Sequence, residues 1–114
     1  MAITGVHVIV YTPEAEAVRA VLRDVLGWPY VDAHDGWLIF ALPPAEIGVH
    51  PGDSPAHEVS LMCDHLDSTM AELQAKGITF EGKPQSRAFG VSATMVLPGG
   101  VRITLYQPRH PTAI

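Results

Sequence analysis

The sequence predicts an α+β fold made of two tandem copies of a βαβββ unit. Three observations predict it. Strand-like and helix-like segments follow one another in the same order in each half. The glycines that would end the two helices, Gly27 and Gly77, lie 50 residues apart. Leu-Pro steps occur at 42–43 and 97–98, which lie 55 residues apart. The second spacing is five residues longer than the first, and we assign these five residues to a longer loop around 83–88.

Each copy of such a unit would bury the face that the other copy leaves open. We therefore expect units 1–52 and 56–114 to form one domain, 1–114, in which a curved mixed sheet surrounds a cleft. A chain of 114 residues with 47% hydrophobic residues is long enough for one such core.

Charge and cysteine content exclude several classes of function. The net charge is −5, and the seven basic residues are scattered, so the basic face of a nucleic-acid-binding protein or of a protein on an anionic membrane is absent from the sequence. The single cysteine, Cys63, leaves no intrachain disulfide. The N-terminus does not resemble a signal peptide, and no apolar run is long enough to span a bilayer. We expect a cytoplasmic protein.

The first half begins with a β-branched segment followed by a helix start at Thr12-Pro13-Glu14. Threonine suits the N-cap, proline the first helical position, and glutamate the positive end of the helix dipole. Apolar residues then recur at helical spacing over 18–25. Asp35-Gly36 is a strong hairpin signal. These features predict four strands, over 5–11, 28–33, 37–42 and 47–50.

The second half follows a linker rich in proline and glycine over 51–56. Asp64 is the expected cap of a helix that carries Leu66, Met70 and Leu73 on one face. A turn at Pro98-Gly99-Gly100 separates the last two strands. The predicted strands are 58–63, 78–81, 89–97 and 101–107, and the tail 108–114 should be extended.

The order and spacing of these segments resemble the vicinal oxygen chelate superfamily of glyoxalases, extradiol dioxygenases and bleomycin-resistance proteins. The resemblance covers nearly the whole chain. The segments that carry it are 5–10, 21–28, 63–73, 76–77 and 97–105.

The resemblance implies a divalent metal ion (Zn, Mn, Fe or Ni) in the cleft, held by the first strand of each unit and by a carboxylate on the last strand. His7 and Glu58 occupy the first-strand positions. Thr104 replaces the usual carboxylate, and Gly48 takes the equivalent place in the first unit, with His50 two residues further on. His7, His50 and Glu58 would then be the ligand set, with His7 and Glu58 within about 5 Å of each other. Because Thr104 stands where the family has a carboxylate, the alternative to this metal site is a cleft that holds no metal ion.

Strand alternation predicts the residues that line the cleft. Ser60 and Met62 should face it, because Leu61 belongs to the row that faces the helix. Thr104 and Tyr106 share one face of the last strand, and Trp37 could line the cleft from the first half.

Two classes of function follow from the resemblance, and both use a small, partly apolar organic molecule. One is a metal-dependent lyase, isomerase or dioxygenase that acts on vicinal oxygens. The other is a protein of the bleomycin-resistance type that sequesters its ligand without catalysis, which Thr104 favours. A cleft filled by the chain's own side chains is a third possibility. We also expect a homodimer, with the strip 106–114 as its interface.

Overall fold

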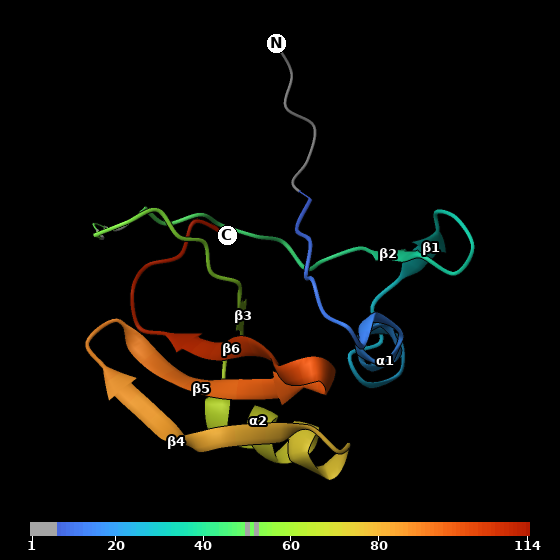
Figure 1. The fold of residues 1–114 in the computed structure, drawn as a ribbon. Helices are drawn as coiled ribbons and strands as arrows, with labels where there is room; N and C mark the ends of the chain where they lie inside the picture. The colour runs from blue at the N-terminus through green and yellow to red at the C-terminus, as the bar shows by residue number, and fades with distance from the viewer. Residues whose placement is uncertain (1–6, 50, 52) are drawn as a thin grey trace.

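The computed structural model describes residues 7–49, 51 and 53–114, which form an α+β fold (Figure 1). The first half contains α1 (Ala15–Ala20), the π-helical turn η1 (Val21–Val25), β1 (Tyr30–Asp32) and β2 (Leu38–Phe40). The second half contains β3 (Ser60–Met62), α2 (Leu66–Ala75), β4 (Thr79–Arg87), β5 (Gly90–Leu97), the 3₁₀ turn η2 (Pro98–Gly100) and β6 (Val101–Pro108). The predicted α+β class is confirmed, and the order of elements after residue 58 is βαβββ.

The second half forms a four-stranded sheet in the order β3-β6-β5-β4. β3 runs parallel to β6, whereas β5 is antiparallel to both of its neighbours. The predicted loop around 83–88 is wrong, because 83–87 continue β4 and Gln85 pairs with Ser92. Between Glu81 and Gln85 the register shifts by two residues, because four positions of β4 there face two of β5, from Thr94 to Ser92.

Helix α2 covers one face of this sheet (Figure 1). Leu66 and Met95 are almost fully buried, at 2% and 1% exposure, because α2 and β5 face each other there. The core also contains Val18, Leu73, Ile78, Ala93, Leu97, Ile103 and Leu105. Burying these side chains is the main favourable term for this half of the fold.

The ends of α2 differ partly from the prediction. His65, and not Asp64, is the N-cap, and its side chain makes no capping hydrogen bond. The Leu66 N–H instead donates to Oε1 of Gln107 on β6, at 2.8 Å. The helix ends at Ala75 with Lys76 as its C-cap, and Gly77 follows as the predicted stop, since a φ of 94° there suits glycine.

The first helix starts later than the sequence indicates. Its N-cap is Glu14, and the Thr12 hydroxyl accepts a hydrogen bond from the Glu14 N–H at 3.2 Å. Gly27, with a φ of 68°, ends the helical segment as predicted. Val18 is buried, and α1 lies beside η2 at the turn between β5 and β6.

β1 and β2 form a separate two-stranded antiparallel sheet. Asp35 and Gly36 both have positive φ, 46° and 86°, as expected for the central residues of a tight hairpin turn. The rings of Tyr30 and Phe40 lie 5.5 Å apart across this hairpin.

The predicted strands at 5–11 and 47–50 are wrong for the part that the structure describes. Residues 7–11 and 47–49 belong to no sheet, while residues 5, 6 and 50 lie outside the described residues. Strand-forming side chains need a neighbouring strand, and in this chain the two segments have none. Among the described residues, no helix has the length and apolar character that crossing a membrane requires.

A candidate ligand-binding face on the second-half sheet

The open face of the four-stranded sheet is the face opposite α2. The strand register sets four side chains in one row across it, because Ser60 pairs with Thr104, Thr104 with Thr94, and Thr94 with Glu81. Directly paired residues project from the same face of a sheet. Leu61 pairs with the buried Leu105, so these two residues belong to the opposite, helix-covered face.

A second row runs beside the first one. It consists of Met62, Tyr106, Ser92 and Gln85, again linked by direct pairing. The open face therefore mixes hydroxyl groups, a thioether and a phenol ring, a combination suited to a ligand with apolar and hydrogen-bonding parts.

Tyr106 is fixed on this face by three contacts. Its hydroxyl donates to the carbonyl of Phe89 at 3.0 Å. Its ring lies 6.0 Å from that of Phe89 and 5.8 Å from that of His110. Burial, together with the negative charge of Glu46, raises the pKa of Tyr106, so the phenol stays neutral.

A pocket of about 350 Å³ lies on the open face. Its lining contains Glu81, Gly82, Lys83, Gln85, Ser92, Ala93, Thr94 and Thr104. In the described part of the chain, the half-buried hydroxyls of Ser92, Thr94 and Thr104 donate no hydrogen bond to another protein group. These hydroxyls are free to bond a ligand or water.

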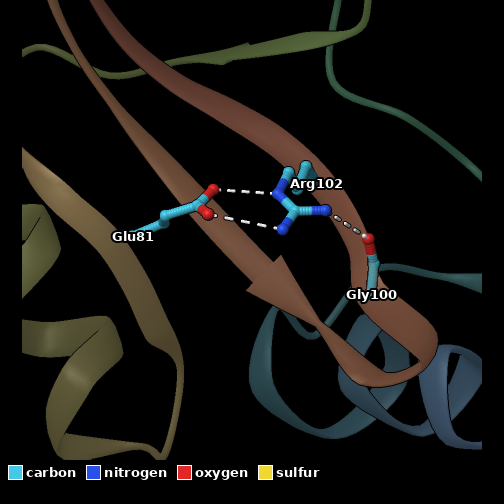
Figure 2. A network of polar contacts seen from close by, with 3 residues as sticks. All are labelled: Glu81, Gly100 and Arg102. Carbon is cyan, nitrogen blue, oxygen red and sulfur yellow. Dashed lines mark hydrogen bonds and ion pairs between the residues drawn. The ribbon is translucent and has the colours of Figure 1, made fainter.

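An ion pair crosses the same face. Figure 2 shows the Arg102 guanidinium of β6 reaching over β5 to the Glu81 carboxylate of β4. Arg102 Nε donates to Glu81 Oε2 at 2.8 Å, and Nη2 donates to Oε1 at 3.3 Å. Hydrogen bonding and charge lower the pKa of Glu81 and raise the pKa of Arg102. The pair is therefore charged at neutral pH.

The residues predicted to bind metal are described only in part. His7 and Glu58 are exposed, neither lies in a strand, and no hydrogen bond or ion pair joins them. His50 lies outside the described residues. No three His, Cys, Asp or Glu side chains in the described ranges form a group that could hold a metal ion. A divalent ion needs about three protein ligands, and the set His7, His50 and Glu58 includes a residue outside the described ranges, so this set stays a prediction.

The other predicted cleft residues divide between the two sheets. Ser60, Thr104 and Tyr106 lie on the open face, as alternation predicts. Trp37 instead lies at the hairpin of the two-stranded sheet and is 48% exposed. That hairpin has its own hollow of about 300 Å³, lined by Pro29, Tyr30, Val31, Ile39, Phe40 and Ala41.

Sequence reasoning missed Ser92, Thr94, Glu81 and Arg102. Ser92 and Thr94 alternate with the apolar residues of β5, and this alternation was the signal that could have placed both on the open face. The ion pair depends on β5 lying between β4 and β6, which no local pattern specifies.

The arrangement of helices and strands is the fold of the glyoxalase/bleomycin resistance protein/dioxygenase superfamily, as the resemblance of the sequence indicated. A similar solved structure is TnmS3, an antibiotic binding protein from Streptomyces sp. CB03234. It is 26% identical, with a TM-score of 0.68, over 95% of this chain and 98% of that one. Lactoylglutathione lyase from Agrobacterium tumefaciens is 16% identical, with a TM-score of 0.66, over 91% of this chain and 92% of that one.

A superfamily member from Sphaerobacter thermophilus is 21% identical, with a TM-score of 0.60, over 92% of this chain and 98% of that one. No family model matches the sequence, and no curated protein does either. The likeness is thus carried by the three-dimensional fold.

Proposed function

We propose that this chain binds a small, partly apolar organic molecule on the open face of the β3-β6-β5-β4 sheet and sequesters it without catalysis. The observation that carries the proposal is the group of hydroxyls from two neighbouring rows, Thr104 and Thr94 in one and Ser92 in the other, that line a pocket of about 350 Å³. The likeness to an antibiotic binding protein, which extends over 95% of this chain, supports the same class of ligand.

The side chains on the face suggest how the ligand is held. Hydroxyls donate and accept hydrogen bonds, so Thr94 and Thr104 suit the carbonyl or hydroxyl groups of a polar edge. Met62 and the ring of Tyr106, in the neighbouring row, suit an apolar or aromatic part. Arg102 and Glu81 at one end are already paired, so they set a charged boundary and favour a ligand without net charge.

The proposal includes no metal step, because the described residues hold no group of three His, Cys, Asp or Glu side chains that could bind an ion. A metal-dependent lyase, isomerase or dioxygenase remains a prediction of the sequence. We further propose that 1–114 acts as one domain of two related units and that it works as a homodimer. A single, half-buried cysteine is consistent with the proposed cytoplasmic location.

Fluorescence titration of the two tryptophans with antibiotics of different classes, bleomycin first, tests the proposal. Losing one ligand hydrogen bond costs about 1 kcal/mol, roughly a fivefold loss of affinity. We therefore expect Ser92→Ala and Thr104→Val to weaken binding by about that factor. Ser68→Ala is the matched control, because Ser68 lies on α2, on the other side of the sheet. Equal effects of Ser92→Ala and Ser68→Ala would place the ligand elsewhere.

A further inference from the structure

The charge of the four-stranded sheet is opposite in sign to the charge of the whole chain. β4 carries Glu81, Lys83 and Arg87, β6 carries Arg102, and β3 and β5 carry no charged residue. The sheet therefore has three cations and one carboxylate, whereas the net charge of the chain is −5. An excess of cations on one surface of an acidic protein creates a local positive potential, which attracts anions.

The single carboxylate of the sheet is already balanced. Figure 2 shows both oxygens of Glu81 turned toward Arg102, from which they accept hydrogen bonds at 2.8 and 3.3 Å. Glu81 lines the pocket of about 350 Å³. A ligand that approaches this pocket therefore meets no unbalanced carboxylate among the described residues that line it.

Lys83 lines the same pocket, and its charge is not balanced. In the part of the chain that the structure describes, its ammonium makes no ion pair and no hydrogen bond. The register of β4 shifts between Glu81 and Gln85, and Gly82 has a φ of 68° at the shift. Such an irregularity bends a strand and changes the direction of its side chains. Lys83 thus brings one unbalanced positive charge to the pocket.

The other free polar groups of the pocket are also hydrogen-bond donors. Arg87 Nη2 donates to Oε1 of Gln85 at 2.8 Å, so the oxygen of this amide is engaged and its Nε2 is left to donate. The hydroxyls of Ser92, Thr94 and Thr104 line the pocket as well. An ammonium, an amide nitrogen and hydroxyls together match an acceptor group that carries negative charge.

We infer that this pocket takes a carboxylate group of the ligand, with Lys83 as the countercharge and Gln85 and Thr94 as hydrogen-bond donors. The inference rests on the proposed function and deepens it, because it names the chemical group that enters the pocket. One unbalanced cation matches a group of single negative charge, whereas a phosphate group carries nearly two. The ligand class is a partly apolar organic acid. Its net charge is zero where an amine on a part outside the pocket balances the carboxylate.

Three naphthalene derivatives that differ in one substituent test the inference: 2-naphthoate, 2-naphthamide and 2-naphthylmethylammonium. Each is titrated into the ¹⁵N-labelled full chain at low ionic strength, and the amide signals of Ser92 and Thr94 report binding in the pocket. We expect naphthoate to bind about fivefold more tightly than naphthamide, and the ammonium compound to bind most weakly. Added salt should weaken the binding of naphthoate alone, because salt screens an exposed charge.

Variants of Lys83 assign the preference to this residue. Lys83→Met removes the charge and keeps an apolar side chain, so it should abolish the preference for naphthoate over naphthamide. Lys83→Arg should retain the preference. Lys76→Met is the matched control, because it causes the same loss of net charge at the end of α2, where the Lys76 ammonium lies 3.8 Å from the Glu72 carboxylate. Lys83 and Lys76 are both exposed, so these variants should remain folded.

The outcomes separate this inference from the proposed function. Equal affinities for naphthoate and naphthamide, with shifts at Ser92 and Thr94, would overturn the inference and leave the proposed binding face standing. Shifts confined to the hairpin hollow at 29–41 would overturn both. Equal effects of Lys83→Met and Lys76→Met would assign the preference to net charge and overturn the inference. Failure of naphthoate to bind at millimolar concentration, or its displacement by an equal concentration of inorganic phosphate, would also overturn it.

Discussion

Arg102 and Glu81 are joined by two hydrogen bonds across an intervening strand, with Nε to Oε2 at 2.8 Å (Figure 2). Arg102 also donates from Nη1 to the carbonyl of Gly100, at 3.4 Å. One guanidinium thus links the outer strand β4 to the start of β6 and to the turn before it. A planar guanidinium makes such several-point contacts with fixed geometry.

The first prediction concerns the pH dependence of this pair. The pKa of Glu81 is lower in the folded chain than in the unfolded chain, so the pair stabilises the fold at neutral pH. That contribution is lost as the pH falls through the lowered pKa. We expect Glu81→Gln to lower the melting temperature slightly at neutral pH and to have no effect in acid. Melting curves from neutral to acid pH check this.

Glu72→Gln is the control for that comparison, because the Glu72 carboxylate lies 3.8 Å from the Lys76 ammonium within one helix. Both pairs are exposed, so both effects are small. A melting difference for Glu81→Gln that grows in acid would contradict the assignment.

The second prediction concerns the core between α2 and the sheet. Met95 is 1% exposed, so Met95→Ala should leave a cavity and cost about 2–5 kcal/mol of unfolding free energy. Met62→Ala, on the open face where Met62 is 37% exposed, should cost much less. Urea denaturation of both variants measures the difference. Equal losses would mean that the open face is covered as fully as the core.

The third prediction concerns the reactivity of the thiol. Burial raises the pKa of Cys63, although a hydrogen bond with Thr69 opposes the shift. We expect iodoacetamide to alkylate the native protein slowly at neutral pH and to react much faster in urea. Mass spectrometry of timed samples measures both rates. Fast native alkylation would show that the β3 edge opens readily.

The fourth prediction addresses the metal hypothesis. Since His7 and Glu58 are exposed, lie outside the strands and share no hydrogen bond or ion pair, we expect Zn²⁺ to leave the NMR signals of the His7 ring unchanged. His34 is the control, because its Nε2 lies 3.1 Å from Asp35 in the exposed hairpin. A selective shift at His7 with added Zn²⁺ would favour the metalloenzyme and count against sequestration alone.

Local patterns predicted most of the second half correctly. The spacing of Leu66 and Leu73 predicted helix α2, and Gly77 predicted where it stops. Both predictions succeeded because a helix and its C-terminal stop depend on residues only a few positions apart. Alternation in the last strand placed Thr104 and Tyr106 on one face for the same reason.

The failures involve partners distant in sequence. Residues 7–11 have strand composition, but composition cannot supply the edge to which a strand must bond. The extension of β4 to Arg87 depends on Gly90 and Ser92 of the neighbouring strand. The strand predicted over 58–63 forms as β3, whereas 7–11 belongs to no sheet, so the approach of His7 to Glu58 stays a prediction.

The hydrogen bond from the Leu66 N–H to Gln107 has a consequence for the order of events during synthesis. The N-terminus of α2 is capped by a side chain that the ribosome adds 41 residues later. β3 likewise cannot form its strand pairing until β6, its parallel neighbour, has been synthesised. An isolated helix of ten residues is only marginally stable in water. We therefore expect α2 to stay only partly helical in the nascent chain until β6 has been synthesised. We therefore expect this half of the protein to complete its fold only after the last strand has been translated, with its apolar strands exposed until then.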